Sequence, residues 1–424
     1  MIKRKLLTEL KNHLEAKEIT LLVGARQAGK TTLLRYLEDE LKGQGHKTVF
    51  LNLDIEADNV HFKSQEGLLK KIRLEIGDKG LVFIDEIQRK ENAGIFLKGL
   101  YDMNLPYKLI VSGSGSLELK EKIHESLSGR KRMFELSTIS FEEFVNLRTS
   151  YQYENSLGDF FQIEGGKTEL LLEEYMNFGG YPKLILSDRV EEKIKIINEI
   201  YRSYLEKDIR FLLDIKKTEA LTDLFRLVAV QSGSMVNVSE LSSTLGIAAA
   251  TVKNYLWYFE KTFIIKKVSP YHTNIRKEIT KAPVFYFSDL GIKNFATGDF
   301  GHVSLSRIGH LFESFIYNIL LEKLENSPSQ ISFWRTKDGA EVDFVIKGGS
   351  RITPVEVKYK RLSRPEITRS LHSFISAYHP DNALVVNLDY KGDMSVGETK
   401  VLFLPFYELM MSPIRILLQY VVGD

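Results

Sequence analysis

Eight residues near the N-terminus, Gly24-Ala-Arg-Gln-Ala-Gly-Lys-Thr31, have the spacing G-x-x-x-x-G-K-[ST] of a phosphate-binding loop. The glycines let backbone N–H groups wrap phosphate oxygens, Lys30 would reach the β- and γ-phosphates, and the Thr31 hydroxyl would bind Mg²⁺. A glycine-containing turn that binds no ligand is the alternative, but the apolar run Ile19–Val23 before the loop and the helical pattern after it favour the phosphate site. The predicted ligands are therefore ATP and Mg²⁺, with these binding residues: Gly24, Ala25, Arg26, Gln27, Ala28, Gly29, Lys30, Thr31, Thr32 and Asp85.

Two carboxylates follow a second apolar run, in Leu81-Val-Phe-Ile-Asp-Glu86. Ligands of open α/β sheets bind outside the carboxyl ends of the strands, which is where this pair would lie. We predict that Asp85 holds the Mg²⁺ shell and that Glu86 polarises the attacking water. An Asp-Glu pair is common by itself, so its position after the phosphate loop carries the prediction.

Two further residues are candidates for catalysis. The run Leu109-Ile-Val-Ser-Gly-Ser-Gly-Ser116 ends in hydroxyls, and either Ser112 or Ser114 could sense the γ-phosphate; a simple strand-end turn is the alternative. Arg130 could stabilise charge on the transferred phosphoryl group, in cis or across a subunit interface. A solvated basic cluster, Arg130-Lys-Arg132, is the competing interpretation.

The elements that must position these residues alternate in type over the first 145 residues. Apolar β-branched runs separated by helix-length segments predict a parallel α/β sheet. The chain as a whole predicts an α/β protein with four parts: an ATPase core at 1–147, a helical lid at 148–218, a winged helix-turn-helix at 219–304 and a C-terminal α/β domain at 305–424.

These motifs together resemble one family. The phosphate loop, the Asp-Glu strand end, the Ser-Gly-Ser strand end, Leu127-Ser-Gly-Arg130, Leu136-Ser-Thr-Ile-Ser-Phe-Glu-Glu-Phe144 and Phe178-Gly-Gly-Tyr-Pro182 are similar to those of prokaryotic AAA-type ATPases of the archaeal-ATPase branch. The resemblance implies ATP binding, a helical lid after the core and a C-terminal domain of uncharacterised function. Sites of AAA-type proteins are often completed by neighbouring subunits, so the resemblance allows a homo-oligomer, although the sequence does not reveal the oligomeric state. Tyr204-Leu-Glu-Lys-Asp-Ile209 looks like another family motif, without a role that the sequence reveals.

A helix-turn-helix pattern lies in the middle of the chain. Val238–Leu245 reads as one short helix, Gly246 as the turn and 248–260 as the second helix. Thr251, Lys253 and Asn254 would face outward, and side chains of these types contact phosphates and base edges from a helix in the major groove. DNA is the predicted partner, and a winged helix that only packs or contacts protein is the alternative.

The C-terminal part carries a second set of acidic residues. Asp343 follows Glu341 on one strand face, and Glu356 and Lys358 share a face of the next strand, with Glu313 on the preceding helix. Two or three carboxylates can hold Mg²⁺ and a lysine can orient water. The arrangement resembles the PD-(D/E)xK restriction-endonuclease-like fold, which implies a metal site at Glu313, Asp343 and Glu356. A nuclease-like scaffold whose carboxylates form salt bridges is the alternative.

Composition sets the remaining limits. The 424 residues contain no cysteine, which excludes disulfides, thiolate zinc sites and cysteine nucleophiles and suggests a reducing cytoplasm. No segment approaches the roughly 20 apolar residues that span a bilayer, so we expect no membrane partner. Basic and acidic residues nearly balance, 58 against 56, so the chain is not coated with positive charge.

Three functions follow from these observations. The first is an ATPase that remodels or translocates on DNA, branched DNA included. The second is an ATP-gated, metal-dependent nuclease. The third, suggested by the near-neutral charge, is a nucleotide-dependent switch or scaffold that binds a protein partner.

Overall fold

The computed structural model describes residues 2–113, 126–205, 219–274, 276, 278 and 281–412. Contacts between residues divide the chain into two compact units. The N-terminal unit comprises Met1–Leu147, Gly180–Thr218 and Tyr255–Ile264. The C-terminal unit comprises Arg148–Gly179, Glu219–Asn254 and Ile265–Asp424.

The N-terminal unit is built on a five-stranded sheet in which every neighbouring pair is parallel. The strands, in their order across the sheet, are β2 (Thr48–Asn52), β3 (Gly80–Asp85), β4 (Tyr107–Ser112), β1 (Ile19–Gly24) and β5 (Lys131–Leu136). The central strand β1 is buried along its whole length, as its continuous apolar run predicts. Because β1 lies between β4 and β5, with β3 next to β4, the carboxyl ends of all the motif-bearing strands share one edge.

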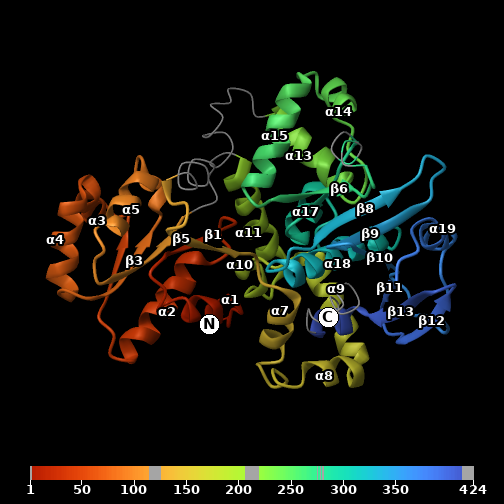
Figure 1. The fold of residues 1–424 in the computed structure, drawn as a ribbon, viewed down its shortest axis with the longest axis horizontal. Coiled ribbons are helices and arrows are strands. Elements are labelled where there is room, and N and C mark those ends of the chain that lie inside the picture. Colours follow the sequence, from red (N-terminus) through yellow and green to blue (C-terminus); the bar gives the residue numbers. More distant parts are fainter. Residues whose placement is uncertain are drawn as a thin grey trace. The chain divides into compact units, whose positions relative to one another are not determined.

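Helices alternate with these strands and pack on the sheet (Figure 1, red to orange). They are α1 (Leu6–Asn12), α2 (Lys30–Gly43), α3 (Glu56–Asn59), η1 (Val60–Lys63), α4 (Gln65–Ile76), η2 (Ile87–Arg89), α5 (Ala93–Asp102) and α7 (Phe141–Arg148). Two later helices, α10 (Pro182–Ile185) and α11 (Val190–Ser203), belong to the same unit. In α2 the buried residues Leu33, Leu34, Leu37 and Leu41 recur at helical spacing, which turns one apolar stripe to the core.

The C-terminal unit contains an eight-stranded mixed sheet. Across the sheet the strands are β12 (Gly392–Val396), β13 (Thr399–Pro405), β11 (Asn382–Asn387), β10 (Arg351–Val357), β9 (Glu341–Gly348), β8 (Gln330–Arg335), β6 (Ile265–Pro270) and β7 (Val284–Phe287). Strands β8, β9 and β10 form an antiparallel meander, whereas β10, β11 and β13 are parallel. The sheet is continuous across residue 305, where the sequence suggested a boundary, because β6 pairs with β8.

Helices of the C-terminal unit include α8 (Leu157–Ile163), α9 (Gly165–Phe178), α13 (Glu219–Val230), α14 (Val238–Leu245), α17 (Leu290–Thr297), α18 (Ile308–Leu324), α19 (Arg369–Tyr378) and α20 (Phe406–Met411). Helix α15 (Ala249–Lys261) begins in this unit and ends in the other. The Asn237 side chain caps α14, and Gly246 ends it with a left-handed φ of 63°, as expected for the turn glycine.

The predicted fold class is confirmed: the protein is α/β, with a parallel-sheet core around the phosphate loop and a C-terminal mixed sheet. The segment 148–218, which the sequence suggested as one lid, is shared between the two units, since α8 and α9 belong to the C-terminal unit. No helix in the described ranges is long and apolar enough to cross a membrane.

Candidate nucleotide site and the C-terminal acidic cluster

The backbone of the phosphate loop takes conformations that only glycine accepts at two points. At Gly24, a Cβ atom would lie 2.1 Å from the carbonyl oxygen of Leu136, so no side chain fits between β1 and β5. Gly29 has a φ of 99°, which L-residues with a side chain rarely adopt. The loop between these glycines leads directly into the N-terminus of α2, where N–H groups and the helix dipole favour an anion.

The predicted nucleotide-site residues Lys30, Thr31 and Asp85 make hydrogen bonds at this edge. The Lys30 side chain is buried and its Nζ donates to the carbonyl oxygens of Gly24 and Ala25, at 3.0 and 2.9 Å. The Thr31 hydroxyl donates to Asp85 Oδ2 at 2.7 Å, which joins the loop to the end of β3. Of the other loop positions, Ala25 and Ala28 are buried, Arg26 and Gln27 are partly buried, and Thr32 is exposed.

Asp85 is 1% exposed, and its carboxylate accepts hydrogen bonds from neutral side chains of three elements. Besides Thr31, these are Ser112 at the end of β4 and Asn52 at the end of β2, the latter at 3.4 Å. Oxygen ligands suit Mg²⁺, which proteins commonly bind through one or two carboxylates together with substrate phosphates. A buried carboxylate beside the Thr31 hydroxyl fits that requirement.

Glu86 follows Asp85 with a left-handed φ of 57°, so its side chain leaves the strand in a different direction. Its carboxylate accepts a hydrogen bond from the Gln88 amide. Burial, more than any other influence, raises the pKa of the Glu86 carboxyl above its ordinary value of 4.5, while the Gln88 hydrogen bond opposes the rise. The backbone therefore changes conformation between Asp85, which ends β3, and Glu86, for which we predicted a different role.

Arg130 lies far from the loop of its own chain. It immediately precedes β5, and its carbonyl oxygen accepts from Ile19 N at the amino end of β1. The loop leaves β1 at the other end, roughly 16 Å away for a six-residue strand. The Arg130 guanidinium pairs instead with Asp102 at 2.8 Å. In this structure Arg130 does not reach the loop of its own chain, and its action across a subunit interface stays a prediction. Ser114 lies outside the described residues.

One tyrosine contacts the loop and a second contacts that tyrosine, both from segments that sequence reasoning did not assign to the site. The hydroxyl of Tyr204 accepts the backbone N–H of Arg26 at 3.1 Å and the hydroxyl proton of Tyr181 at 3.2 Å. Tyr181 belongs to the Phe178–Pro182 turn, and Tyr204 opens the motif that had no evident role. In the sequence, the only sign of a role was that both tyrosines lie in motifs that resemble those of the family. Each lies more than 150 residues from Arg26, so local spacing could not connect them to the loop.

The C-terminal unit gathers the residues of the second acidic set around β9 and β10. Asp343 Oδ2 accepts from Val357 N at 2.6 Å, and Glu356 pairs with Lys358 at 2.5 Å. Thr368 Oγ1 donates to the other oxygen of Glu356 at 2.9 Å. Glu313, on α18, accepts from the Tyr286 hydroxyl at 2.5 Å.

These contacts do not make a three-carboxylate metal centre. Within the described part of the chain, no three His, Cys, Asp or Glu side chains converge to hold a metal ion, so the predicted ligand set of Glu313, Asp343 and Glu356 is not assembled. Each of these carboxylates has protein donors of its own. Burial first, and the nearby charge of Glu313 second, raise the pKa of Asp343 well above its ordinary value. We derive no cleavage step from this cluster.

Three family models match successive parts of the chain. Residues 16–145 match the family described as "AAA domain". Residues 169–302 and 308–407 match two families described as domains of unknown function, DUF8612 and DUF4143.

Relatives among curated proteins are remote and carry no described activity. An uncharacterised protein of Mycobacterium tuberculosis is 25% identical over 375 residues, 88% of this chain and 76% of its own length. One from Haemophilus influenzae is 24% identical over 390 residues, 90% of this chain and 89% of its own. One from Methanocaldococcus jannaschii is 26% identical over 347 residues, 79% of this chain and 73% of its own.

Solved structures show distant likeness. The Aeropyrum pernix Orc1 protein in complex with DNA is 13% identical with a TM-score of 0.29, covering 69% of this chain and 91% of that one. AMPPCP-bound DnaA from Aquifex aeolicus is 17% identical with a TM-score of 0.26, covering 61% and 86%. The AAA-domain match over residues 16–145 and the loop geometry agree with each other, and both support a P-loop nucleotide-binding domain in the N-terminal unit.

Proposed function

We propose that the protein is a Mg²⁺-dependent ATPase whose hydrolysis acts on DNA. The observation that carries the ATPase part is the meeting of Thr31, Asp85 and Ser112, from three neighbouring elements, beside the N-terminus of α2. Hydroxyl and carboxylate oxygens lie together at the point where loop N–H groups favour an anion. Glu86 is held next to this point by its own backbone turn.

Each side chain then has a defined task. Loop N–H groups and Lys30 would bind the phosphates, with Lys30 exchanging its carbonyl partners for phosphate oxygens. Thr31 and Asp85 would hold Mg²⁺, which when bound neutralises negative charge on the β- and γ-phosphate oxygens. Ser112 and Asn52 keep the Asp85 carboxylate in place. Glu86 would orient and polarise the attacking water.

Support for DNA as the partner comes from the arrangement of α14, α15 and the β6–β7 hairpin. Val252 is buried, whereas Lys253 and Asn254 are exposed at the start of α15, the face that would enter a major groove. Lys267 is exposed on β6, which pairs antiparallel with β7 as a wing would. A cation and an amide exposed on a second helix suit phosphate and base-edge contact.

The test is ATP turnover by the full chain with single-stranded, duplex, forked and four-way DNA. We expect DNA to stimulate turnover, and Lys253→Ala to weaken DNA binding and to reduce the slope of log K against log salt by about 1, because one phosphate contact is lost. Lys347→Ala, which removes another exposed lysine of the C-terminal unit, is the matched control and should behave as wild type. Turnover that ignores every DNA, or an unchanged Lys253→Ala, would refute the DNA role.

A further inference from the structure

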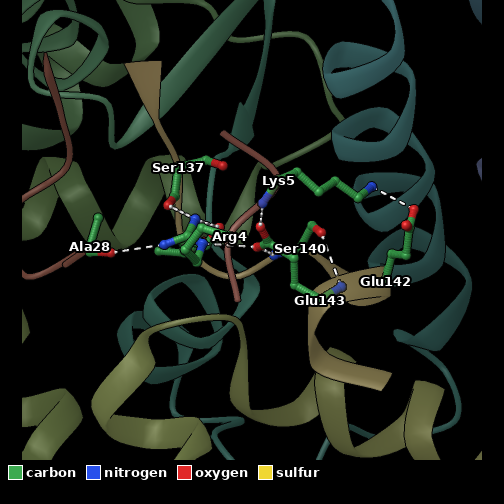
Figure 2. A network of polar contacts seen from close by, with 8 residues as sticks. Arg4, Lys5, Ala28, Ser137, Ser140, Glu142 and Glu143 are labelled. Carbon is green, nitrogen blue, oxygen red and sulfur yellow. Dashed lines mark hydrogen bonds and ion pairs between the residues drawn. The ribbon is translucent and has the colours of Figure 1, made fainter. Parts of the chain in front are cut away.

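The helix that follows β5 begins with a reciprocal pair of hydrogen bonds. Glu143 N donates to Ser140 Oγ at 3.3 Å, and Ser140 N donates to Glu143 Oε2 at 3.0 Å, which is a capping box. Lys5 N donates to the other carboxylate oxygen of Glu143 at 2.8 Å. Figure 2 shows these contacts around Glu143. The cap therefore fixes a carboxylate in a buried position at the start of α7.

Arg4 binds this carboxylate and reaches the phosphate loop with the same guanidinium group. Its Nε donates to Glu143 Oε2 at 3.1 Å, and the two side chains are only 8% and 7% exposed. Its Nη2 donates to the carbonyl oxygens of Ser137 and Thr138, at 2.8 and 3.2 Å. Its Nη1 donates to the carbonyl oxygen of Ala28 at 3.1 Å (Figure 2). A basic side chain that could have faced phosphate or solvent is thus enclosed by protein acceptors.

The hydrogen bond from Arg4 to the Ala28 oxygen sets the orientation of the Gly29 N–H. In a planar trans peptide the C=O of Ala28 and the N–H of Gly29 point in opposite directions. Gly29 is free to turn because it has no Cβ, and its φ of 99° is one of several values open to glycine. A donor that holds the Ala28 oxygen on one side therefore holds the Gly29 N–H on the other side. That N–H directly precedes Lys30, at the helix N-terminus where a phosphate would sit.

We propose that Arg4, held by the capped Glu143, is a positioning residue that locks the Ala28–Gly29 peptide so that its N–H is directed at a nucleotide phosphate. The inference rests on the proposed nucleotide site. It adds a requirement that the loop motif alone does not contain. The segment before α1, which carries Arg4, and the β5–α7 connection must both be in place for the loop to hold its binding shape.

The test compares Arg4→Lys with wild type in binding of a fluorescent ADP analogue, N-methylanthraniloyl-ADP, by the full chain. Lysine keeps the charge, but its single amino group cannot reach acceptors that the guanidinium fork spans. Because the hydrogen bond from a charged group to the Ala28 oxygen is lost, we expect affinity to fall about 10- to 100-fold. The KM for ATP should rise similarly, with a smaller change in kcat, because ground state and transition state lose the same contact.

Lys5→Ala is the matched control. It removes a neighbouring cation whose partner, Glu142, is only partly buried, and it leaves the Lys5 N–H in place. Its affinity for the analogue should equal that of wild type. Equal losses in Arg4→Lys and Lys5→Ala would indicate a general effect of charge and overturn the proposal.

Thermal unfolding separates positioning from stability. A folded Arg4→Lys with wild-type affinity overturns the proposal, whatever its unfolding temperature. If Arg4→Lys does not fold, Glu143→Gln decides by the same criterion, since it removes the charge facing Arg4 and keeps one acceptor oxygen, for one of the two backbone donors. A wild-type chain that binds the analogue without hydrolysing ATP refutes the proposed function alone, and one that binds no nucleotide refutes both.

Discussion

Glu86→Gln is expected to bind ATP with nearly wild-type affinity and to hydrolyse it about 10²- to 10⁴-fold more slowly, the range that a general base contributes. Glutamine has the same shape but cannot accept the proton of the attacking water. The Thr31–Asp85 hydrogen bond does not involve the Glu86 carboxylate, which accepts from Gln88 instead. The substitution therefore leaves the oxygens proposed for Mg²⁺ in place.

The measurement pairs single-turnover hydrolysis with equilibrium binding of nucleotide. Glu91→Gln, an identical change at an exposed position five residues later, is the control and should retain wild-type rates. Hydrolysis by Glu86→Gln at the wild-type rate would remove Glu86 from the catalytic role. Weak binding together with slow hydrolysis would instead assign it to the binding of the nucleotide.

The placement of Lys30, Thr31, Asp85 and Ser112 at one edge of the sheet could be predicted from the sequence because each depends on local features. Each element consists of one apolar strand followed at once by its functional residues, and parallel pairing brings the strand ends to one edge. Gly24 illustrates the limit: the motif requires a glycine there, but the sequence does not show that Leu136 of β5 is the backbone it must accommodate. Strand β5 itself escaped prediction because only Phe134 and Leu136 are buried in it, so it lacks the continuous apolar run of β1.

Contacts that join distant segments could not be predicted. Arg4 and Glu143 are 139 residues apart, and each looks ordinary alone, one in a basic run and one in a helix start. Tyr204 meets Arg26 over an even longer separation. In the acidic cluster the prediction failed in another way. Glu356 and Lys358 were predicted to share one face of a strand, and this shared face let them form an ion pair with each other. The periodicity of a strand predicts which face a side chain occupies, whereas the hydrogen-bond and ionic partners of that side chain depend on tertiary packing.

Arg130→Ala is expected to lower ATP turnover by about 10³- to 10⁵-fold, the effect of an arginine that stabilises phosphoryl transfer from a neighbouring subunit. In this chain Arg130 lies at the amino end of the parallel strands, away from its own phosphate loop. Its pair with Asp102 is partly exposed, and such pairs contribute only about 0–1 kcal/mol, so the side chain is easily released to another partner. Arg132→Ala, two residues later on an exposed position, is the control and should keep its activity.

Complementation distinguishes action in trans from damage within one chain. Lys30→Ala lacks the lysine that would hold the phosphates but retains Arg130, whereas Arg130→Ala retains an intact phosphate loop. Each variant alone should be nearly inactive, and co-expressed chains should regain part of the turnover, because a Lys30→Ala subunit can supply its arginine to the loop of an Arg130→Ala neighbour. Turnover should also rise more steeply than protein concentration where assembly is incomplete. Mixed assemblies as inactive as either variant would show that Arg130 does not complete a neighbour's site, and a monomeric wild type with full turnover would lead to the same conclusion.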